Sequence, residues 1–298
     1  MKYVVTGGAG FIGTNLVNEL VKNGHEVHVI DNFCGGYKKS RINHKATYHD
    51  VNLSNHSNFD KIVNILTKSD TVFHMACIAR VQPSIIDPVG YEINNSISSA
   101  IILKACVDSK VRRLVYSSSS SVYGNNTNLP LKESFGVNPL SPYGAQKFYG
   151  EVLCKTYHEV YGLETVSLRY FNVYGEHQSH DSAYALVIGI FMNQKENNKF
   201  LTVRGNGEQR RDFTYVGDVV NANILASSST AVGGGDVINI GNGENRSINQ
   251  IARCIGGKID YIEPVLEPFE TLADINEAKR KLGWIPTMNV EDWIKSQI

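Results

Sequence analysis

Near its start the chain reads Lys2-Tyr-Val-Val-Thr-Gly-Gly-Ala-Gly-Phe-Ile-Gly13, and this stretch decides the fold. The β-branched run over residues 2–6 predicts a strand that ends in a glycine-rich turn. Apolar residues then recur at helical spacing, which predicts a helix over residues 11–23. A second strand is predicted over residues 26–31, after the stop signal at Gly24. Strand, glycine turn, helix and strand together form a βαβ unit.

The same alternation continues as far as residue 172. Strands are predicted over 46–49, 71–75, 113–117 and 164–169, and helices over 56–67, 93–109 and 143–161. Because parallel neighbours need crossover connections, which are usually helices, this order predicts an α/β fold with a doubly wound parallel Rossmann sheet. Later elements are shorter and mixed, with helices predicted over 184–194, 216–227, 247–255 and 274–282 and strands over 200–203 and 237–240. We therefore predict a Rossmann domain over 1–172 and a smaller mixed α/β cap domain over 173–298, some segments of which return to the first domain.

The composition narrows the class of protein. The 298 residues hold 29 Lys+Arg against 29 Asp+Glu, so no net charge attracts a nucleic acid backbone. The longest apolar stretch, residues 184–192, is far shorter than the ~20 residues of a membrane helix, and no signal peptide is recognised. Five cysteines without a CxxC pattern favour a reducing cytoplasm, and His177 and His180 have no third strong ligand nearby. We expect a cytoplasmic protein with no metal site and no nucleic acid or membrane partner.

The glycine turn predicts a dinucleotide site. Gly7, Gly10 and Gly13 follow a strand and open a helix, a context in which backbone N–H groups and the helix N-terminus bind a pyrophosphate. Asp31 ends the next strand, where its carboxylate accepts hydrogen bonds from a ribose diol and repels a 2′-phosphate. This combination favours NAD over NADP. The alternative is a glycine turn that only packs tightly, with Asp31 as a solvated loop acid.

A second set of residues indicates alcohol oxidation. Tyr143 and Lys147 lie four apart at the start of a predicted helix, hence on one face, and a nearby ammonium favours a phenolate. Such a phenol, with its pKa lowered towards working pH, suits a general base that takes a hydroxyl proton. The hydroxyls of residues 117–121 follow a strand, at the edge where parallel sheets bind ligands, although the residues alone do not say which serine acts. An exposed tyrosine beside a solvated lysine is the alternative for the pair by itself.

Taken together, these motifs resemble those of a known family. They are TGGAGFIG at 6–13, VIDNF at 29–33, SSSSSVYG at 117–124, SPYGAQK at 141–147, LRYFNVYG at 168–175, RRDFTYVGDV at 210–219 and LGWIP at 282–286. In these stretches the chain resembles the extended short-chain dehydrogenase/reductases. Within them it is similar to the UDP-galactose 4-epimerase-like sugar-nucleotide epimerases, which use NAD. The resemblance runs nearly from end to end.

The resemblance implies three groups of site residues. The implied catalytic residues are Ser119, Tyr143 and Lys147. The implied NAD-binding residues are Gly7, Gly10, Phe11, Ile12, Gly13, Asp31, Asn32, Asp50, Val51, Met75, Ala76, Ala79 and Asn94, together with Tyr143 and Lys147. The implied substrate-binding residues are Ser84, Ser119, Tyr143, Asn172, Ala185, Leu186, Arg211 and Thr271, with Asn172 and Arg211 on the diphosphate.

The implied reaction is NAD-dependent 4-epimerisation of a nucleotide-diphosphate sugar, either UDP-glucose/UDP-galactose or the N-acetylated pair. Tyr143 would take the C4 hydroxyl proton while hydride passes to NAD, and the 4-keto sugar would turn over before hydride returns. Related dehydratases and decarboxylases place acidic residues just after the catalytic hydroxyl, where this chain has Ser120 and Ser121. These enzymes are the first alternative, and a non-catalytic NAD-binding regulator is the second.

Two positions depart from the family pattern. Many members carry an arginine that grips the diphosphate in the loop before the last helices, and residues 263–268 contain none. Arg211 or Arg204 would then act alone on the diphosphate. Thr271 occupies the position where the family sets pocket size, and this small residue leaves space for an N-acetyl group. We therefore expect N-acetylated substrates to be accepted.

The resemblance also implies a homodimer. In relatives, the helices that correspond to residues 93–109 and 143–161 pair in a four-helix contact. Their candidate contact residues here are Ile97, Ile101, Val152 and Tyr157.

Overall fold

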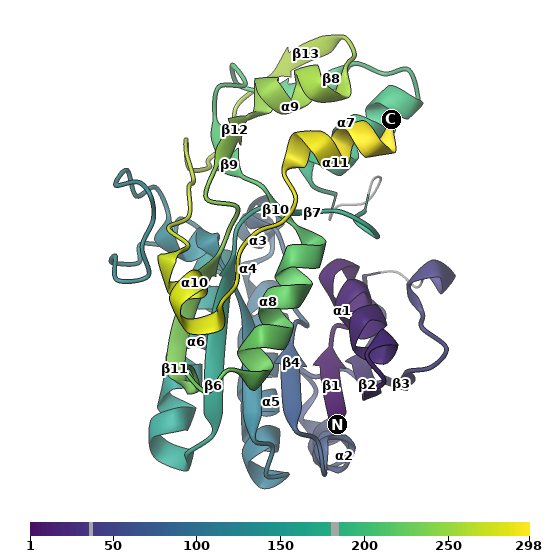
Figure 1. The fold of residues 1–298 in the computed structure, drawn as a ribbon, viewed down its shortest axis with the longest axis vertical. Coiled ribbons are helices and arrows are strands. Elements are labelled where there is room, and N and C mark those ends of the chain that lie inside the picture. The colour runs from purple at the N-terminus through teal and green to yellow at the C-terminus, as the bar shows by residue number, and fades with distance from the viewer. Residues whose placement is uncertain (36–37, 180–184) are drawn as a thin grey trace.

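The computed structural model describes residues 1–35, 38–179 and 185–298. Its centre is a parallel seven-stranded sheet with the order β11-β6-β5-β4-β1-β2-β3, which confirms the predicted doubly wound Rossmann fold (Figure 1). The strands are β1 Lys2–Thr6, β2 Glu26–Asp31, β3 Thr47–Asp50, β4 Thr71–His74, β5 Arg113–Ser119, β6 Glu164–Tyr170 and β11 Gly234–Ile240. The order reverses between β1 and β4, and such a switch point opens a crevice at the carboxyl ends of the strands.

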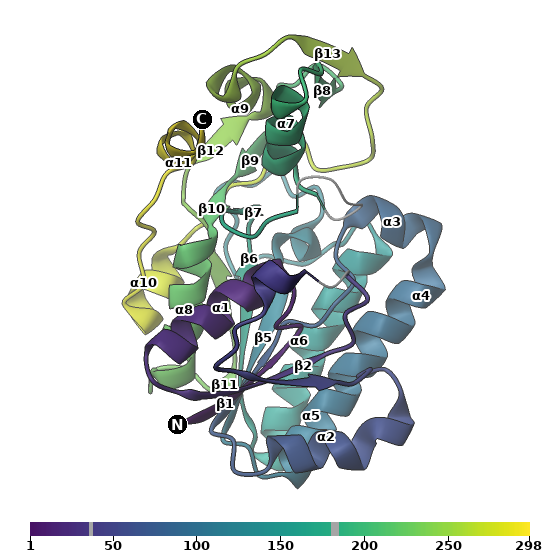
Figure 2. The same cartoon turned by 90° about the vertical axis from the view of Figure 1, so that its right-hand side faces the viewer.

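Helices cover both faces of the sheet (Figure 2). One face carries α1 Phe11–Lys22, α8 Val216–Ser228 and α10 Asn276–Leu282. The other carries α2 Phe59–Leu66, α5 Ser98–Asp108 and α6 Pro142–Tyr161, with α3 Val81–Ile86, α4 Pro88–Glu92 and the π-helical turn Ile93–Ile97 before α5. Short 3₁₀ turns cover Lys39–Arg41, His56–Asn58 and Ser120–Tyr123. The helix predicted over 93–109 is therefore interrupted by a π turn near its start.

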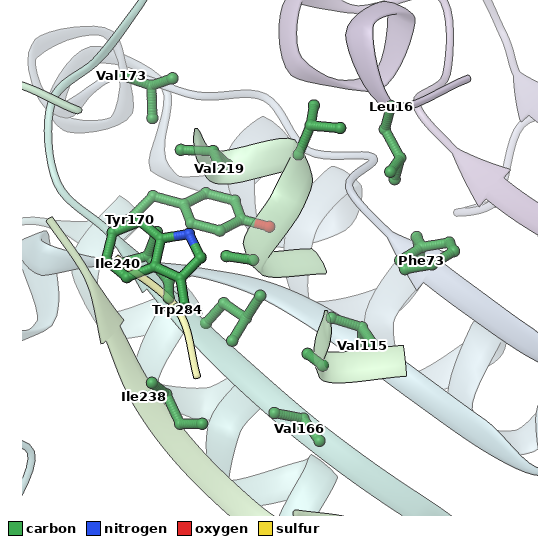
Figure 3. Close-up of a cluster of buried hydrophobic side chains, with 14 of the residues drawn as sticks. Leu16, Phe73, Val115, Val166, Tyr170, Val173, Val219, Ile238, Ile240 and Trp284 are labelled. Carbon is green, nitrogen blue, oxygen red and sulfur yellow. The ribbon is translucent and has the colours of Figure 1, made fainter. Parts of the chain in front are cut away.

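The larger core lies between the sheet and the first of these helix layers. Trp284, which is fully buried, packs there with Tyr170, Val219 and Ile240, as Figure 3 shows. Its indole N–H donates to the Asp218 carbonyl at 2.8 Å, so this large aromatic side chain is buried without an unsatisfied donor. This packing joins the segment after α10 to helix α8 and to strands β6 and β11.

A smaller cap stands over the carboxyl ends of the strands. It contains α7 Val187–Glu196, α9 Ile248–Ile255, α11 Val290–Gln297 and the parallel pair β8 Leu201–Arg204 and β13 Ile259–Ile262. Phe191, Ile251 and Trp293 belong to its separate apolar core. The pairs β7 Val173–Tyr174 with β10 Thr214–Tyr215, and β9 Arg210–Asp212 with β12 Asn245–Ser247, connect the cap to the sheet. The helix predicted from residue 184 begins at Val187, and residue 184 lies outside the described residues.

Some of the second half belongs to the main sheet. β11 pairs with β6 through Ile238 and Ile240, both fully buried, and extends the sheet that the first half begins. Helices α8 and α10 lie on the same sheet, so a single cut at residue 172 does not separate its layers. Periodicity predicted the strand but not its neighbour, because pairing depends on which apolar edge remains open after the other strands have assembled. The boundary at residue 172 remains a prediction.

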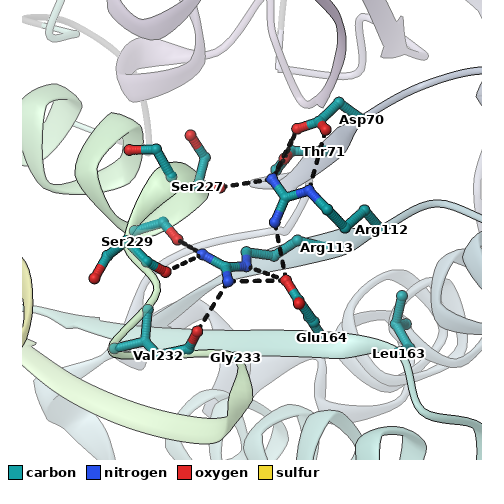
Figure 4. A network of polar contacts seen from close by, with 12 residues as sticks. Asp70, Thr71, Arg112, Arg113, Leu163, Glu164, Ser227, Ser229, Val232 and Gly233 are labelled. Carbon is teal, nitrogen blue, oxygen red and sulfur yellow. Dashed lines mark hydrogen bonds and ion pairs between the residues drawn. The ribbon is translucent and has the colours of Figure 1, made fainter.

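Two adjacent arginines close the opposite end of the sheet (Figure 4). Arg113, at the start of β5, donates to the carbonyls of Ala226, Ser229 and Val232 at 2.7–2.9 Å and pairs with Glu164 at 2.8 Å. Arg112 pairs with Asp70 and Glu164 at 2.8 and 2.9 Å. The arginines thus join three strands to the end of α8, far along the strands from the glycine turn.

Candidate active site

The glycine turn after β1 leaves no room for side chains. A Cβ on Gly13 would lie 2.2 Å from the Gly7 carbonyl oxygen, and one on Gly7 would lie 2.8 Å from the Ala76 backbone. Gly7 also has a φ of +68°, which favours glycine. Helix α1, the turn and the loop after β4 are therefore packed backbone against backbone.

The start of α1 is suited to an anion. Its N-cap is Gly10, which offers no side-chain cap, and its first turn has no acidic residue. By contrast, Ser141 caps α6 and Ser247 caps α9 through side-chain hydrogen bonds. The first N–H groups of an uncapped helix are free to bind phosphate oxygens, and the helix dipole favours negative charge there. Phe11 and Ile12, both half-buried, begin this helix.

The next two strands bring the predicted ribose and adenine residues beside the turn. The Asp31 carboxylate accepts hydrogen bonds from the backbone N–H of Ala9 at 3.0 Å and of Phe33 at 2.8 Å. Asp50 lies in register with Asp31 on β3, and the Val51 N–H donates to the Asp31 carbonyl at 3.1 Å. The Asn32 side chain accepts from the N–H of Cys34 at 3.1 Å. The carboxylate of Asp31 is thus fixed against the glycine turn.

Hydroxyl groups of two neighbouring elements hold the loop after β4. The Thr6 hydroxyl accepts from the N–H groups of Met75 and Ala76 at 3.2 and 3.1 Å. The carbonyl of Ala79 accepts from the Tyr91 hydroxyl at 2.9 Å. These contacts place the predicted cofactor residues Met75, Ala76 and Ala79 along the crevice next to Gly7.

Asn95 braces this loop, a contact that the sequence analysis missed. Its side chain accepts from the Ile78 N–H at 2.8 Å and donates to the Ile78 carbonyl at 3.1 Å and to Gln146 at 3.0 Å. The predicted residue, Asn94, instead donates to the Gly90 carbonyl at 2.8 Å, one turn back along the helix. Adjacent asparagines were visible in the sequence, but the π turn decides which one faces the loop.

His74 lies beneath the loop as a buried neutral imidazole. Its Nδ1 lies 2.8 Å from the Thr6 hydroxyl and its Nε2 lies 3.1 Å from the Ser99 hydroxyl. Burial, with a smaller contribution from the charge of Lys147, lowers the pKa of His74 to about 3. Because this pKa is below the ordinary value of 6.5, the unfolded chain binds a proton before the folded one does as pH falls.

We expect His74 to cause much of the acid sensitivity of the fold. Its contribution to the free energy of unfolding is complete above pH 6.5. It declines by roughly 1.4 kcal/mol per pH unit as pH falls towards 3. In urea titrations at several pH values, His74→Gln should flatten this slope, whereas His44→Gln, at an exposed site, should leave it unchanged. An unaltered slope in His74→Gln would contradict the assignment.

Ser119, Tyr143 and Lys147 meet at the carboxyl end of β5. The Lys147 ammonium, 3% exposed, donates to the Ser117 carbonyl at 2.8 Å and lies 5.8 Å from the centre of the Tyr143 ring. The Ser119 hydroxyl lies near enough to the Tyr143 phenol to lower its pKa, and it accepts a hydrogen bond from the Ser121 N–H at 3.2 Å. All three side chains therefore face one point below the cap.

The other strand serines are occupied elsewhere. The Ser117 hydroxyl lies 3.1 Å from that of Tyr170, and the Ser118 hydroxyl donates to Glu151 at 2.5 Å. Of the three hydroxyls that end β5, the one turned towards Tyr143 is that of Ser119. Alternation along the strand turns Ser118 to the opposite face from Ser117 and Ser119, and the Ser117 hydroxyl is already bonded to Tyr170.

The predicted lowering of the pKa of Tyr143 by Lys147 is wrong, because this pKa is raised in the folded protein. Desolvation raises it above its ordinary value, and the nearby Ser119 hydroxyl lowers it only in part. The Lys147 ammonium is already bonded to the Ser117 carbonyl.

The predicted substrate residues lie on two sides of the crevice. On the sheet side, the Ser84 hydroxyl accepts from the Tyr143 N–H at 3.2 Å and donates to the Val81 carbonyl at 2.6 Å. Asn172 directly follows β6, and its carbonyl accepts from the Thr214 N–H at 3.1 Å. On the cap side, Ala185 is buried and Leu186 is the residue before α7.

Arg211 and Thr271 lie together in the segment that joins sheet and cap. Arg211 donates to the carbonyls of Arg210 and Phe269 and pairs with Glu267 at 2.8 Å. Thr271 is buried, and its hydroxyl accepts from the Asp212 N–H at 3.4 Å. Glu267 is a partner that the sequence analysis did not anticipate, because the ion pair depends on a loop placement that no motif encodes.

Two features are absent from the described residues. Within residues 1–35, 38–179 and 185–298, no helix is both long and apolar enough to cross a membrane. The same residues hold no group of three or more His, Cys, Asp or Glu side chains arranged for a metal ion. His180, one of the two histidines considered from the sequence, lies outside the described residues.

Several solved structures are similar to this chain along its whole length. A UDP-N-acetylglucosamine 4-epimerase from Methanobrevibacter ruminantium M1, in complex with UDP-N-acetylmuramic acid, is 35% identical, with a TM-score of 0.90 over 100% of this chain and 99% of that chain. A UDP-glucose 4-epimerase from Thermotoga maritima with UDP-glucose is 32% identical, with a TM-score of 0.93 over 99% and 96%. A UDP-glucuronic acid 4-epimerase from Bacillus cereus, in complex with UDP-glucuronic acid and NAD, is 32% identical, with a TM-score of 0.89 over 99% and 97%.

A family model agrees with these structures and with the motifs quoted from the sequence. The model of the NAD dependent epimerase/dehydratase family matches residues 3–241, from the first strand to the end of β11. The match includes the glycine turn, the serines of β5 and the Tyr143–Lys147 helix. The resemblance is thereby confirmed, and the chain belongs to the NAD dependent epimerase/dehydratase family.

Proposed function

We propose that this protein is an NAD-dependent 4-epimerase of UDP-sugars. The observation that carries the proposal is the meeting of Ser119, Tyr143 and Lys147 at the end of β5, across the crevice from the uncapped glycine turn. A binding protein needs the glycine turn but not a half-buried phenol with a serine hydroxyl and an ammonium nearby. Three similar structures that are 4-epimerases of UDP-sugars support this reading.

The cofactor fits the residues of the crevice. The uncapped start of α1, with Phe11 and Ile12, would hold the pyrophosphate. The remaining NAD contacts would come from Gly7, Gly10, Gly13, Asp31, Asn32, Asp50, Val51, Met75, Ala76, Ala79, Asn94 and Lys147. Fixed backbone at the turn suits a phosphate, because a Cβ on Gly7 or Gly13 would collide with neighbouring backbone. Bound NAD would supply the hydride acceptor and a positively charged ring next to Tyr143.

The protein's own residues would move the proton and hold the sugar. Tyr143 would take the proton of the C4 hydroxyl as the hydride leaves, and return it when the hydride comes back to the other face. Ser119 would hydrogen-bond the same hydroxyl, and Lys147 would keep positive charge beside the phenolate that forms. Proton and hydride are both returned, so substrate and product are isomers.

Substrate contacts are proposed on both sides of the crevice. Asn172 and Arg211 would hold the diphosphate, where a planar guanidinium can bind phosphate oxygens in pairs. Ser84, Ala185, Leu186 and Thr271 would line the sugar pocket, and the small Thr271 leaves space for an N-acetyl group. UDP-N-acetylhexosamines are thus proposed as substrates alongside UDP-glucose and UDP-galactose.

Elimination or decarboxylation is the alternative within the family. The residues after Ser119 distinguish this alternative from epimerisation. The related dehydratases and decarboxylases carry acidic residues there, whereas this chain has Ser120 and Ser121 in a 3₁₀ turn. The Ser121 side chain donates to the Ser119 hydroxyl at 3.0 Å and offers no carboxylate. Epimerisation needs no such acid, so these serines favour it.

A panel of UDP-, dTDP-, GDP- and CDP-sugars tests the proposal. NMR should detect inversion at C4 of a UDP-sugar without net NADH formation. A 4-keto product or released carbon dioxide would favour the alternative, and absence of turnover with every sugar would contradict the proposed function. Lack of turnover with the N-acetylated pair alone would contradict the role given to Thr271.

We also propose that the protein is a cytoplasmic homodimer. The groove between α4 and α6 is lined by apolar residues such as Val89, Ile93 and Tyr149, and Ile97 and Val152 are also exposed nearby. One residue considered from the sequence does not fit, since Ile101 is buried in the core. Tyr157 is half-buried and packs on the exposed Tyr161, with ring centres 5.0 Å apart. A second copy would cover this face. All five cysteines are free thiols, which suits a reducing compartment. The cytoplasmic location is testable by cell fractionation.

Val152→Glu should convert the dimer to a monomer. A carboxylate placed on this 45% exposed position of α6 would have to be desolvated at the contact. Sedimentation velocity should show a dimer for the wild type and for Phe200→Glu, a matched change at an exposed position in the cap. A monomeric wild type, or a dimeric Val152→Glu, would count against this interface.

A further inference from the structure

Arg80 is held in a conformation that its chemistry does not favour. Its φ of +104° and ψ of +135° lie in a region that glycine adopts readily and other residues avoid. Its side chain is half-buried, and within the described parts of the chain no hydrogen bond or ion pair reaches its guanidinium. Strained residues of this kind gather at sites that bind ligands. A partly desolvated cation without a partner is a binding group for an anion.

Arg80 lies between the proposed catalytic helix and the segment over residues 263–268. It immediately precedes α3, in which Ser84 accepts from the Tyr143 N–H at 3.2 Å. In the same helix, the Gln82 side chain donates to the Leu266 carbonyl at 2.9 Å, so α3 touches the segment directly. This segment is the one in which the family's phosphate-gripping arginine is expected and in which this chain has none.

The charges around Arg80 are those of a diphosphate site. Burial lowers the pKa of Arg80 most, Tyr91 and Glu267 raise it through space, and Arg204 lowers it. Glu267 also holds Arg211, the residue proposed for the diphosphate, at 2.8 Å. Glu267 thus pairs with one arginine and acts through space on a second, and together with Arg204 these residues carry a net positive charge. A diphosphate that takes the place of Glu267 would neutralise it.

We propose that Arg80 binds the diphosphate of the sugar nucleotide and supplies, from the sheet side, the cation that residues 263–268 lack. This proposal rests on the proposed function and specifies how its substrate is held. Glu267 then acts as an internal anion that competes with the diphosphate for Arg211. A sugar carboxylate is the less favoured ligand for Arg80, because Glu267, which acts on Arg80 through space, is also the ion-pair partner of Arg211.

Arg80→Gly separates binding from folding. Glycine accepts the observed φ, so this variant should unfold at a higher temperature than the wild type while losing affinity for UDP. Calorimetric titration of the NAD-loaded protein with UDP should show a Kd about 10- to 100-fold higher, the usual effect of losing a charge-assisted hydrogen bond. Uridine, which has no phosphate, should bind both proteins equally. Arg80→Lys should recover part of the loss, and Glu267→Gln should bind UDP more tightly than the wild type.

The matched control is Lys110→Gly. Lys110 is also a cation at positive φ, 57°, but it is exposed and follows α5 at the far end of the sheet. This variant should gain stability without any change in UDP affinity. An unchanged UDP affinity in Arg80→Gly would overturn the proposal, as would an equal loss for uridine and UDP. Loss of UDP-glucuronate binding alone would assign Arg80 to a sugar carboxylate and would also overturn it. UDP binding is measured without turnover, so a failure of epimerisation contradicts the proposed function separately.

Discussion

Tyr143→Phe should lower kcat for C4 epimerisation by roughly 10²–10⁴-fold, the range expected when a general base is removed. The change deletes one oxygen from a half-buried ring and leaves the glycine turn untouched, so NAD should bind as in the wild type. Burial raises the pKa of Tyr143, which makes the phenol reluctant to ionise before substrate and cofactor are in place. Wild-type kcat/KM should accordingly rise as pH is increased above neutrality, and the residual activity of the variant should not.

Tyr149→Phe provides the control for this measurement. Tyr149 lies in the same helix α6 but is 43% exposed, on the groove side. Its kcat and pH profile should match those of the wild type. If Tyr143→Phe retained wild-type turnover, another group would have to serve as the base. If it lost NAD binding together with turnover, the change would have disturbed the crevice and not the chemistry.

Arg113→Met should reduce the free energy of unfolding by about 3–5 kcal/mol, because three carbonyl groups lose their donor and each costs about 1–3 kcal/mol when left unsatisfied. The guanidinium is almost fully buried and satisfies three carbonyl groups as well as Glu164. Methionine fills the volume but leaves these carbonyls without a donor. Their desolvation is then not compensated by hydrogen bonds, which destabilises the folded state. The network is at the amino ends of the strands, and the turnover of molecules that remain folded should be unchanged.

Urea denaturation of Arg113→Met and Arg280→Met tests this expectation. Arg280 makes an ion pair with Glu277, one turn away in α10, and its side chain is 65% exposed, so its loss should have a much smaller effect than the loss of Arg113. Equal effects of the two substitutions would show that the buried network contributes no more than a surface pair. A loss of kcat in folded Arg113→Met would place the network in the active site.

Local pattern was sufficient for the strands and helices of the first half. β1 and β2 have the predicted bounds, because β-branched runs and glycine stops act within a few residues. The π turn at Ile93–Ile97 was not predictable in this way, and Asn95, which lies in this turn, is the asparagine that bonds to the loop after β4. Helical periodicity assumes a constant turn, so one extra residue in a turn changes which side chain faces the crevice.

In the active site, too, the sequence pattern predicted some features and the tertiary structure decided others. Motif spacing indicated that Tyr143 and Lys147 share a helix face, and it placed the serines at a strand end. It did not predict the sign of the effect on the pKa of Tyr143, because desolvation depends on how much of the rest of the chain covers the phenol. The choice among the serines followed from which hydroxyls were already bonded to Tyr170 and Glu151, two side chains from later in the chain.

By itself, the sequence determined the parallel Rossmann sheet, the NAD-type glycine turn with Asp31, and the identity of the residues proposed for catalysis. These features depend on contacts between residues close together in the chain, or on motifs short enough to be read directly. Only the tertiary structure decided that β11 completes the sheet, that Arg113 closes its far end and that Glu267 holds Arg211 beside Arg80. Each of these joins segments more than fifty residues apart. Such pairings are selected by the burial and charge that remain once the other elements have packed, and no local pattern records them.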